Sequence, residues 1–66
     1  MQVYFFEYSN SNYAWNGKAD NRSQFEVLRE QFVDFLQAKL GSSYDATKVI
    51  AFYRDSDGKK VYVNVW

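Results

Sequence analysis

The chain has 66 residues, the size of one small domain, and a domain of this size buries only about 60% of the surface that its unfolded chain exposes. Eight basic residues balance eight acidic ones, which argues against a strongly charged nucleic-acid clamp and against an acidic mimic of DNA. Apolar residues make up 47% of the chain and aromatic residues 21%, a composition typical of a folded protein. We therefore expect one small α+β domain over residues 1–66.

The sequence contains no cysteine and no histidine. This excludes disulfides, thiolate metal sites and cysteine nucleophiles, and it removes the commonest general base. Asp55 and Asp57 begin a D-x-D pattern, but Lys59 and Lys60 stand where a calcium loop needs a ligand and a glycine. We expect no enzymatic activity, no cofactor, no metal site and no small-molecule substrate.

No apolar run approaches the ~20 residues of a membrane span, and no basic, apolar leader opens the chain. The sequence therefore favours a cytoplasmic protein without a membrane partner.

In the first third of the chain, two strands are predicted. Residues 2–8 are rich in β-branched and aromatic side chains and predict a strand that ends in a turn at the small polar residues 9–12. Residues 13–15, followed by the turn dipeptide Asn16-Gly17, predict a short second strand that pairs back on the first.

A helix is predicted to begin at Ser23, because Ser23 and Glu26 have the spacing of a capping box. Apolar residues then recur at spacings of three and four and form one stripe that needs a sheet to lie against: Phe25, Leu28, Phe32, Phe35, Leu36 and Leu40. Gly41 is expected to end the helix, since glycine readily adopts the left-handed conformation found there.

Residues 48–54 and 60–66 predict two further strands joined by Asp55-Ser56-Asp57-Gly58, a connection suited to a hairpin. A loop of two or four residues places Ile50 and Phe52 on the side of Val61, Val63 and Val65, which the helix should cover. The whole order predicts a two-layer α+β fold, with one antiparallel or mixed sheet of three or four strands in β-β-α-β-β order, of β-grasp type or similar, and one helix packed on one face.

One helix covers one side of a sheet, so the other side should present aromatic rings. We place Val3 and Phe5 inside, because the hydroxyls of Tyr4 and Tyr8 favour a wet surface. The expected exposed row is then Tyr4, Phe6, Tyr8, Tyr53, Tyr62 and Trp66. Such a row serves cross-strand packing, a protein interface, or base stacking with nearby cations on phosphates, and the sequence leaves these alternatives open.

Two other surfaces are candidates for binding a partner. Tyr13 and Trp15 are large side chains in a polar, asparagine-rich segment, where the alternative to recognition is simple turn formation. Glu26, Glu30 and Asp34 are spaced to share one side of the helix, where the alternative to an acidic docking face is an ordinary solvated one.

These features favour a small stoichiometric protein-binding module, of the kind by which phages and mobile elements inhibit or regulate a larger host protein. It would act through the exposed aromatics and the acidic helix face. The first alternative is a single-stranded nucleic-acid-binding protein that uses an aromatic sheet face. The second is a structural subunit of a homo-oligomer.

Overall fold

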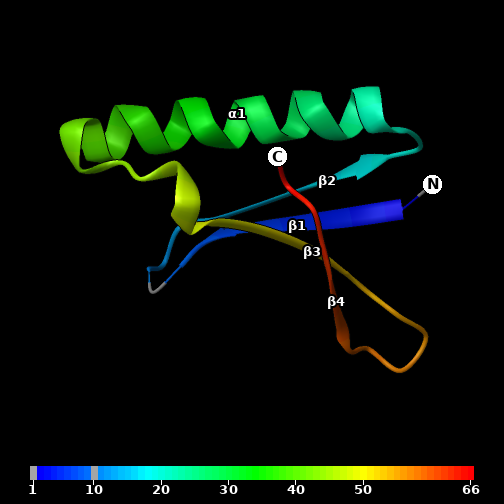
Figure 1. Cartoon of the computed structure of the whole chain (residues 1–66). Coiled ribbons are helices and arrows are strands. Elements are labelled where there is room, and N and C mark those ends of the chain that lie inside the picture. The colour runs from blue at the N-terminus through cyan, green and yellow to red at the C-terminus, as the bar shows by residue number, and fades with distance from the viewer. Residues whose placement is uncertain (1, 10) are drawn as a thin grey trace.

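The computed structural model of the chain describes residues 2–9 and 11–66. Within these residues a four-stranded antiparallel sheet in the order β2-β1-β3-β4 lies against one α-helix (Figure 1). The elements in chain order are β1 (Gln2–Tyr8), β2 (Ala14–Ala19), α1 (Arg22–Leu40), the short 3-10 helices η1 (Gly41–Ser43) and η2 (Ala46–Lys48), β3 (Val49–Arg54) and β4 (Lys60–Val63). The predicted two-layer α+β fold with one helix is confirmed, and β1 and β3 are its central strands.

β1 matches the prediction, and β2 is longer than predicted. The amide of Ser11 donates to the carbonyl of Tyr8 in the turn between them, while Asn10 of the expected turn lies outside the described residues. Asn16 and Gly17, predicted as a turn, lie inside β2. A Cβ atom on Gly17 would collide with the side chain of Leu28. The glycine therefore allows close approach of α1 to the sheet.

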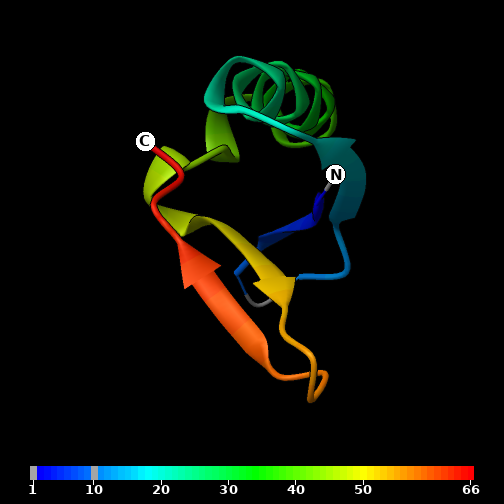
Figure 2. The ribbon, with the colours of Figure 1, turned by 90° about the vertical axis from the view of Figure 1, so that its right-hand side faces the viewer.

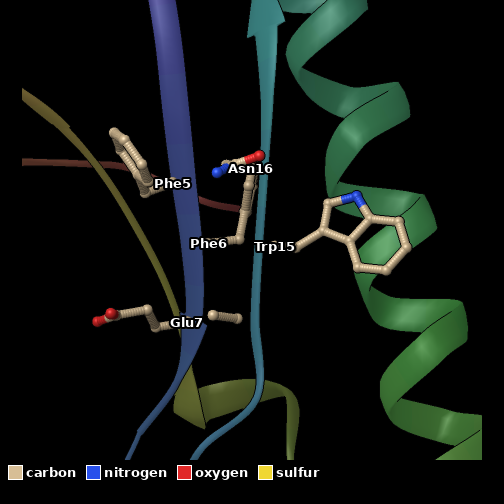
Figure 3. A pocket seen from close by; sticks show the side chains of 6 residues that line it. Phe5, Phe6, Glu7, Trp15 and Asn16 are labelled. Atoms are coloured by element: carbon tan, nitrogen blue, oxygen red, sulfur yellow. The ribbon is translucent and has the colours of Figure 1, made fainter.

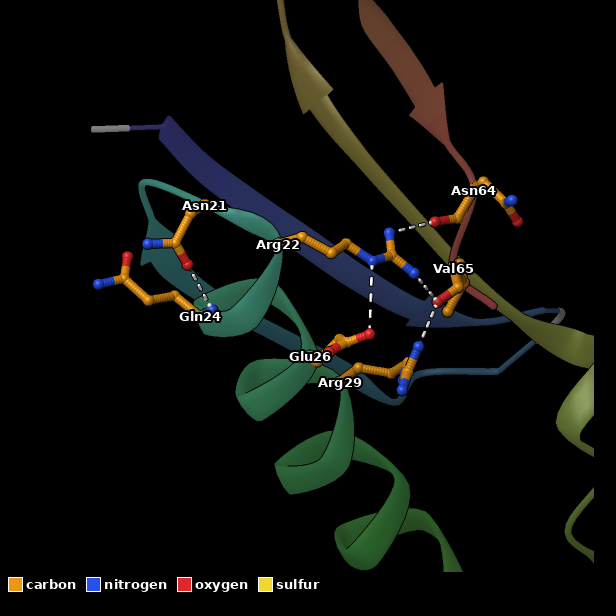
Figure 4. A network of polar contacts seen from close by, with 7 residues as sticks. All are labelled: Asn21, Arg22, Gln24, Glu26, Arg29, Asn64 and Val65. Atoms are coloured by element: carbon orange, nitrogen blue, oxygen red, sulfur yellow. Dashed lines mark hydrogen bonds and ion pairs between the residues drawn. The ribbon is translucent and has the colours of Figure 1, made fainter.

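α1 has the predicted end and a different beginning. Its N-cap is Asn21, whose side chain accepts a hydrogen bond from the amide of Gln24 at 3.0 Å (Figure 4). The prediction that Ser23 and Glu26 form the capping box is therefore wrong. Gly41 ends the helix as predicted, with φ of +55° and ψ of −125°, a positive-φ conformation that favours glycine but differs from the left-handed helical one.

The core lies between α1 and the sheet. The ring of Phe6 lies 5.1 Å from that of Phe25 and 6.2 Å from that of Phe32, measured between centroids. Burial of one such side chain contributes about 1.5–3 kcal/mol. The buried cluster consists of Phe6, Tyr8, Ala19, Phe25, Phe32, Leu36, Val49, Ala51 and Val65.

The β3–β4 hairpin has a loop of odd length, which reverses the predicted faces of β3. The amide of Asp55 donates to the carbonyl of Lys59 at 3.0 Å, and Gly58 between them has φ of +79°. This is a three-residue hairpin loop with glycine in the left-handed position. A register shift of one residue turns every side chain to the other face. Ile50 and Phe52 consequently face away from α1, and the prediction that the helix covers them is wrong.

β1 pairs with β3 and is likewise turned over relative to the prediction. The side chains of β1 that were predicted to face outward face α1, and those predicted to face α1 lie on the other side of the sheet. Phe6 pairs with buried Ala51, and the Tyr8 hydroxyl accepts a hydrogen bond from the amide of Asp45 at 2.9 Å, so this hydroxyl needs no water. The ring of Tyr4 packs edge-on against Phe25 and Tyr53. The predicted outward orientation is therefore wrong for Tyr4, Phe6, Tyr8 and Tyr53, and the predicted inward orientation is wrong for Val3 and Phe5.

β4 ends at Val63, and residues 64–66 continue towards α1 (Figures 2 and 4). Arg22 donates to the carbonyls of Asn64 and Val65 at 2.9 and 3.1 Å, and Arg29 donates to that of Val65 at 2.8 Å. The guanidinium of Arg29 also lies 4.7 Å from the ring centroid of Trp66. Two helix arginines thus hold the C-terminal segment over the edge of the core.

Candidate functional site

The face of the sheet opposite α1, here called the open face, takes its side chains from all four strands. They alternate along each strand with the residues that pack on the helix. β1 contributes Phe5 and Glu7; β2 contributes Ala14, Asn16 and Lys18; β3 contributes Ile50, Phe52 and Arg54; β4 contributes Lys60 and Tyr62.

Three rings cross the open face in one row. Phe52 pairs with Phe5 on one side and with Tyr62 on the other. The rings of Phe5 and Phe52 are stacked, with centroids 5.3 Å apart and planes 15° apart, and the Tyr62 ring lies 5.9 Å from that of Phe52. Phe52 is 1% exposed although it lies outside the main core, whereas Tyr62 is 62% exposed. We call these three residues the aromatic row.

Two cations lie over the aromatic row. The guanidinium carbon of Arg54 is 5.7 Å from the ring centroid of Phe5 and 5.6 Å from that of Phe52. Because these distances are nearly equal, Arg54 lies over the junction of the two stacked rings. The ammonium of Lys60 is 4.6 Å from the Phe52 centroid and 3.7 Å from the carboxylate of Glu7. The cations therefore cover Phe52 and leave positive charge at the surface, each contact contributing about 0.5–1 kcal/mol.

An open depression of about 370 Å³ adjoins the aromatic row between β1 and β2 (Figure 3). Phe5 and Glu7 stand along its β1 side. Asn16 pairs with Phe5 across it, and the short side chain of Ala14 pairs with Glu7. Trp15 points the other way, towards α1. The depression is thus bordered by Phe5 and Asn16, while the carboxylate of Glu7 points away from β2 towards Lys60 (Figure 3).

The two sides of the molecule carry different charge. On the strands of the open face, Lys18, Arg54 and Lys60 outnumber the one carboxylate of Glu7. On the helix, the acidic face of Glu26, Glu30 and Asp34 is exposed as predicted, and Glu26 forms an ion pair with Arg22 at 3.7 Å. The strands of the open face therefore carry an excess of positive charge, whereas in α1 Arg22, Arg29 and Lys39 balance the three carboxylates.

The predicted sheet-face residues do not come together. Of the six, Tyr62 lies on the open face, and four lie on the helix side. Trp66 is 54% exposed but sits on the C-terminal segment, where its indole donates to the carbonyl of Ala46. Phe5 and Phe52, which the sequence placed inside, complete the aromatic row. The odd hairpin loop at Gly58 is the signal that would have identified Phe52, whereas Phe5 is placed by the long-range pairing of β1 with β3.

The predicted loop anchors belong to the core. Trp15 lies in β2, and its ring centroid is 5.5 Å from that of Phe35 and 6.4 Å from that of Phe32. Tyr13 packs edge-on against Phe35 at 5.7 Å. These two side chains are therefore partly buried against α1 and the core, and their proposed role in binding a partner stays a prediction.

Shifted pKa values occur away from the open face. Hydrogen bonds from the side chain and amide of Thr47 lower the pKa of Asp45, and burial, with Tyr8 and Asp45 nearby, raises the pKa of Tyr44. In the described part of the chain, no cluster of three or more histidine, cysteine or acidic side chains is placed to bind a metal ion. No described helix is long and apolar enough to cross a bilayer.

No protein-family model matches the chain, and neither does any curated protein or solved structure. The interpretation of the open face therefore depends on its own geometry and charge.

Proposed function

We propose that the protein binds single-stranded nucleic acid on its open face and acts by binding alone. The observation that carries the proposal is the two accessible rings of the aromatic row, Phe5 and Tyr62, on either side of the covered Phe52, with Arg54 and Lys60 beside them. Proteins that hold single strands combine rings on which bases stack with cations that follow the phosphates, and each stacked base contributes about 1–3 kcal/mol.

The positions of the aromatic rings weigh against the protein-binding module that the sequence favoured and support the first alternative, nucleic-acid binding. The argument for a protein-binding module depended on a surplus of exposed aromatic side chains. Phe6, Tyr8, Tyr13 and Trp15 all pack on the helix side, so that surplus is smaller than expected. The rings that stay on the surface lie among cations, and this combination favours a polyanion over a neutral protein surface.

The cations of the open face support a modest, salt-dependent affinity. Lys18, Arg54 and Lys60 offer three cations to a bound strand. For a single strand, the logarithm of the binding constant falls as the logarithm of the salt concentration rises, with a slope of about 0.7 for each phosphate neutralised. Three such contacts predict a slope of about 2, which corresponds to a loss of roughly 20-fold between about 50 and about 200 mM salt.

Fluorescence anisotropy of a labelled, mixed-sequence single strand tests the proposal at these two salt concentrations. We expect saturable binding that weakens by roughly 20-fold at the higher salt. Tyr62→Ala should weaken binding by roughly 5- to 100-fold, because it removes the most exposed ring of the row. Trp66→Ala is the matched control, since it removes an exposed ring outside the open face, and it should leave the affinity unchanged.

Two results would contradict the proposal. One is the absence of binding at both salt concentrations by protein that circular dichroism shows to be folded. The other is binding that Tyr62→Ala and Trp66→Ala weaken equally. Light scattering of the free protein tests the remaining alternative, a homo-oligomer. The molar mass of a homo-oligomer would exceed the 7.8 kDa of one chain.

A second candidate function is the binding of a basic protein to the helix. Val27 is 52% exposed on the outer side of α1, and Glu30 and Asp34 follow it at helical spacings of three and seven. An apolar side chain flanked by carboxylates can anchor a basic surface of a partner. A partner of this kind should be lost on Glu30→Lys and retained on Lys60→Ala, the reverse of the pattern expected for a nucleic acid.

A further inference from the structure

We infer that a bound nucleic acid crosses the open face along the aromatic row, with its phosphates on the side of the row nearer the β3–β4 hairpin and the outer edges of its bases on the other side. This inference rests on the proposed function, because it orients the bound nucleic acid on the same face. The register of the four β-strands carries it.

The aromatic row follows one line across the whole sheet. Asn16 of β2 pairs with Phe5 of β1. Phe52 of β3 pairs with Phe5 on one side and with Tyr62 of β4 on the other. Because neighbouring β-strands lie about 4.8 Å apart, this line across four of them is roughly 14 Å long. A nucleic acid that stacks bases on both Phe5 and Tyr62 must therefore run across the β-strands and not along them.

The cations of these four β-strands all lie on one side of this line. Lys18 comes two residues after Asn16 in β2, and Arg54 comes two residues after Phe52 in β3. Lys60 of β4 pairs with Arg54. Both steps lead towards the β3–β4 hairpin, since β2 and β3 are both antiparallel to β1. At about 3.3 Å per residue, the cations begin about 7 Å from the line.

The other side of the line has the opposite character. Ala14 and Ile50 both pair with Glu7 there, so the carboxylate of the open face lies between two aliphatic side chains. A carboxylate repels phosphates, whereas aliphatic side chains tolerate the edges of bases. The backbone of a bound nucleic acid is therefore favoured on the hairpin side and disfavoured on this one.

The cations differ in what holds them. Arg54 donates to the carbonyl of Gly58 at 3.0 Å, and this hydrogen bond keeps its guanidinium on the hairpin side. The ammonium of Lys60 instead reaches back to the carboxylate of Glu7 at 3.7 Å. In the hairpin loop, the carboxylate of Asp55 accepts hydrogen bonds from two backbone amides of the loop itself. The inferred orientation therefore depends mainly on the cations of β2 and β3.

Variants that each lose one positive charge test the orientation by fluorescence anisotropy, with a labelled oligothymidine of about ten nucleotides. Lys18→Gln and Arg54→Gln each remove a cation from the hairpin side. We expect each to lower the salt slope by about 0.7 and to weaken binding by roughly 3- to 10-fold at about 50 mM salt. Lys48→Gln is the matched control, because Lys48 is exposed and precedes β3 at its other end. It should change neither quantity.

Proton nuclear Overhauser effects in the complex report the orientation directly. Val3 pairs with Lys18 on the hairpin side of the line, so its methyl groups should contact protons of the sugars. Ala14 and Ile50 lie on the other side, and their methyl groups should contact the methyl groups of thymine, which project from the base.

The outcomes separate this inference from the proposed function. If the folded wild-type protein does not bind, both are overturned. If it binds but Lys48→Gln lowers the salt slope as much as Lys18→Gln does, the inference is overturned and the binding function stands. The same conclusion follows if Lys18→Gln has no effect, or if sugar protons contact Ile50 instead of Val3. Should Arg54→Gln be unfolded by circular dichroism, Lys18→Gln on the exposed β2 decides the question.

Discussion

Truncation of two neighbouring phenylalanines in β1 should have very different effects on stability. Phe6 is fully buried between Phe25 and Phe32 of the helix. Replacing a buried phenylalanine with alanine costs about 3–5 kcal/mol, through lost burial and the cavity that remains. A chain of 66 residues has a free energy of unfolding of roughly 3–10 kcal/mol. Phe6→Ala should therefore leave the domain largely or wholly unfolded.

Phe5 lies on the open face and is only half-buried. Its main contact is the stacked ring of Phe52, and an aromatic pair of this kind contributes about 0.5–1.5 kcal/mol beyond its buried area. We expect Phe5→Ala to cost about 1–2 kcal/mol, since little cavity forms at a surface position. The variant should remain folded.

Urea unfolding followed by far-ultraviolet circular dichroism measures both effects. If Phe6→Ala has no folded baseline, Phe6→Leu and Phe5→Leu provide a milder pair with the same expected order. Equal losses in the two variants, or a larger loss at Phe5, would refute the assignment of Phe6 to the core and Phe5 to the open face.

Other predictions concern the C-terminal segment, a pKa and the hairpin. Arg29→Ala removes a charged hydrogen bond to the carbonyl of Val65 and should cost about 1.5–3 kcal/mol in urea unfolding; an unchanged midpoint would show that this contact contributes nothing. The Asp45 carboxylate accepts hydrogen bonds from Thr47 that lower its pKa. Its stabilising effect is therefore present above the ordinary aspartate pKa and is lost as the pH falls through the lowered value. Thr47→Val should raise this pKa in an NMR titration, and a constant value would contradict the assigned cause. Gly58 has φ of +79°, so Gly58→Ala should cost about 1–2 kcal/mol and lower the melting temperature by roughly 4–16 °C, whereas Gly58→Asn should cost less.

Much of the fold follows from local patterns in the sequence. The spacing of the apolar residues predicted the helix, and Gly41 predicted its end. The segments rich in β-branched and aromatic residues predicted β1 and the β3–β4 hairpin. Two local signals misled. Asn21 with Gln24 and Ser23 with Glu26 both have cap spacing, and the pattern alone does not choose between them. The Asn16-Gly17 turn preference is overridden by pairing along β1 and by the close approach of the helix.

The faces of the sheet were harder to predict, and the candidate site depended on them. Both faces of β1 are largely apolar, so its own alternation does not decide which side is buried. Which side of β3 is buried depends on whether the hairpin loop has an odd or an even number of residues. Including or excluding the single residue Lys59 changes that number from one to the other. The odd loop places Phe52 on the open face beside Tyr62, and the register of β1 with β3 brings Phe5 next to Phe52. A sequence pattern without this register therefore misses the site.

The proposed function is tested most directly by mapping where a single strand binds. NMR signals of backbone amides and of side chains would be followed while an oligonucleotide is added at low salt. We expect the largest changes at Phe5, Asn16, Phe52 and Tyr62 on the open face, and little change at Glu30 on the outer side of α1. Changes confined to α1 or to the C-terminal segment, or no changes at all, would contradict the assignment of nucleic-acid binding to the open face.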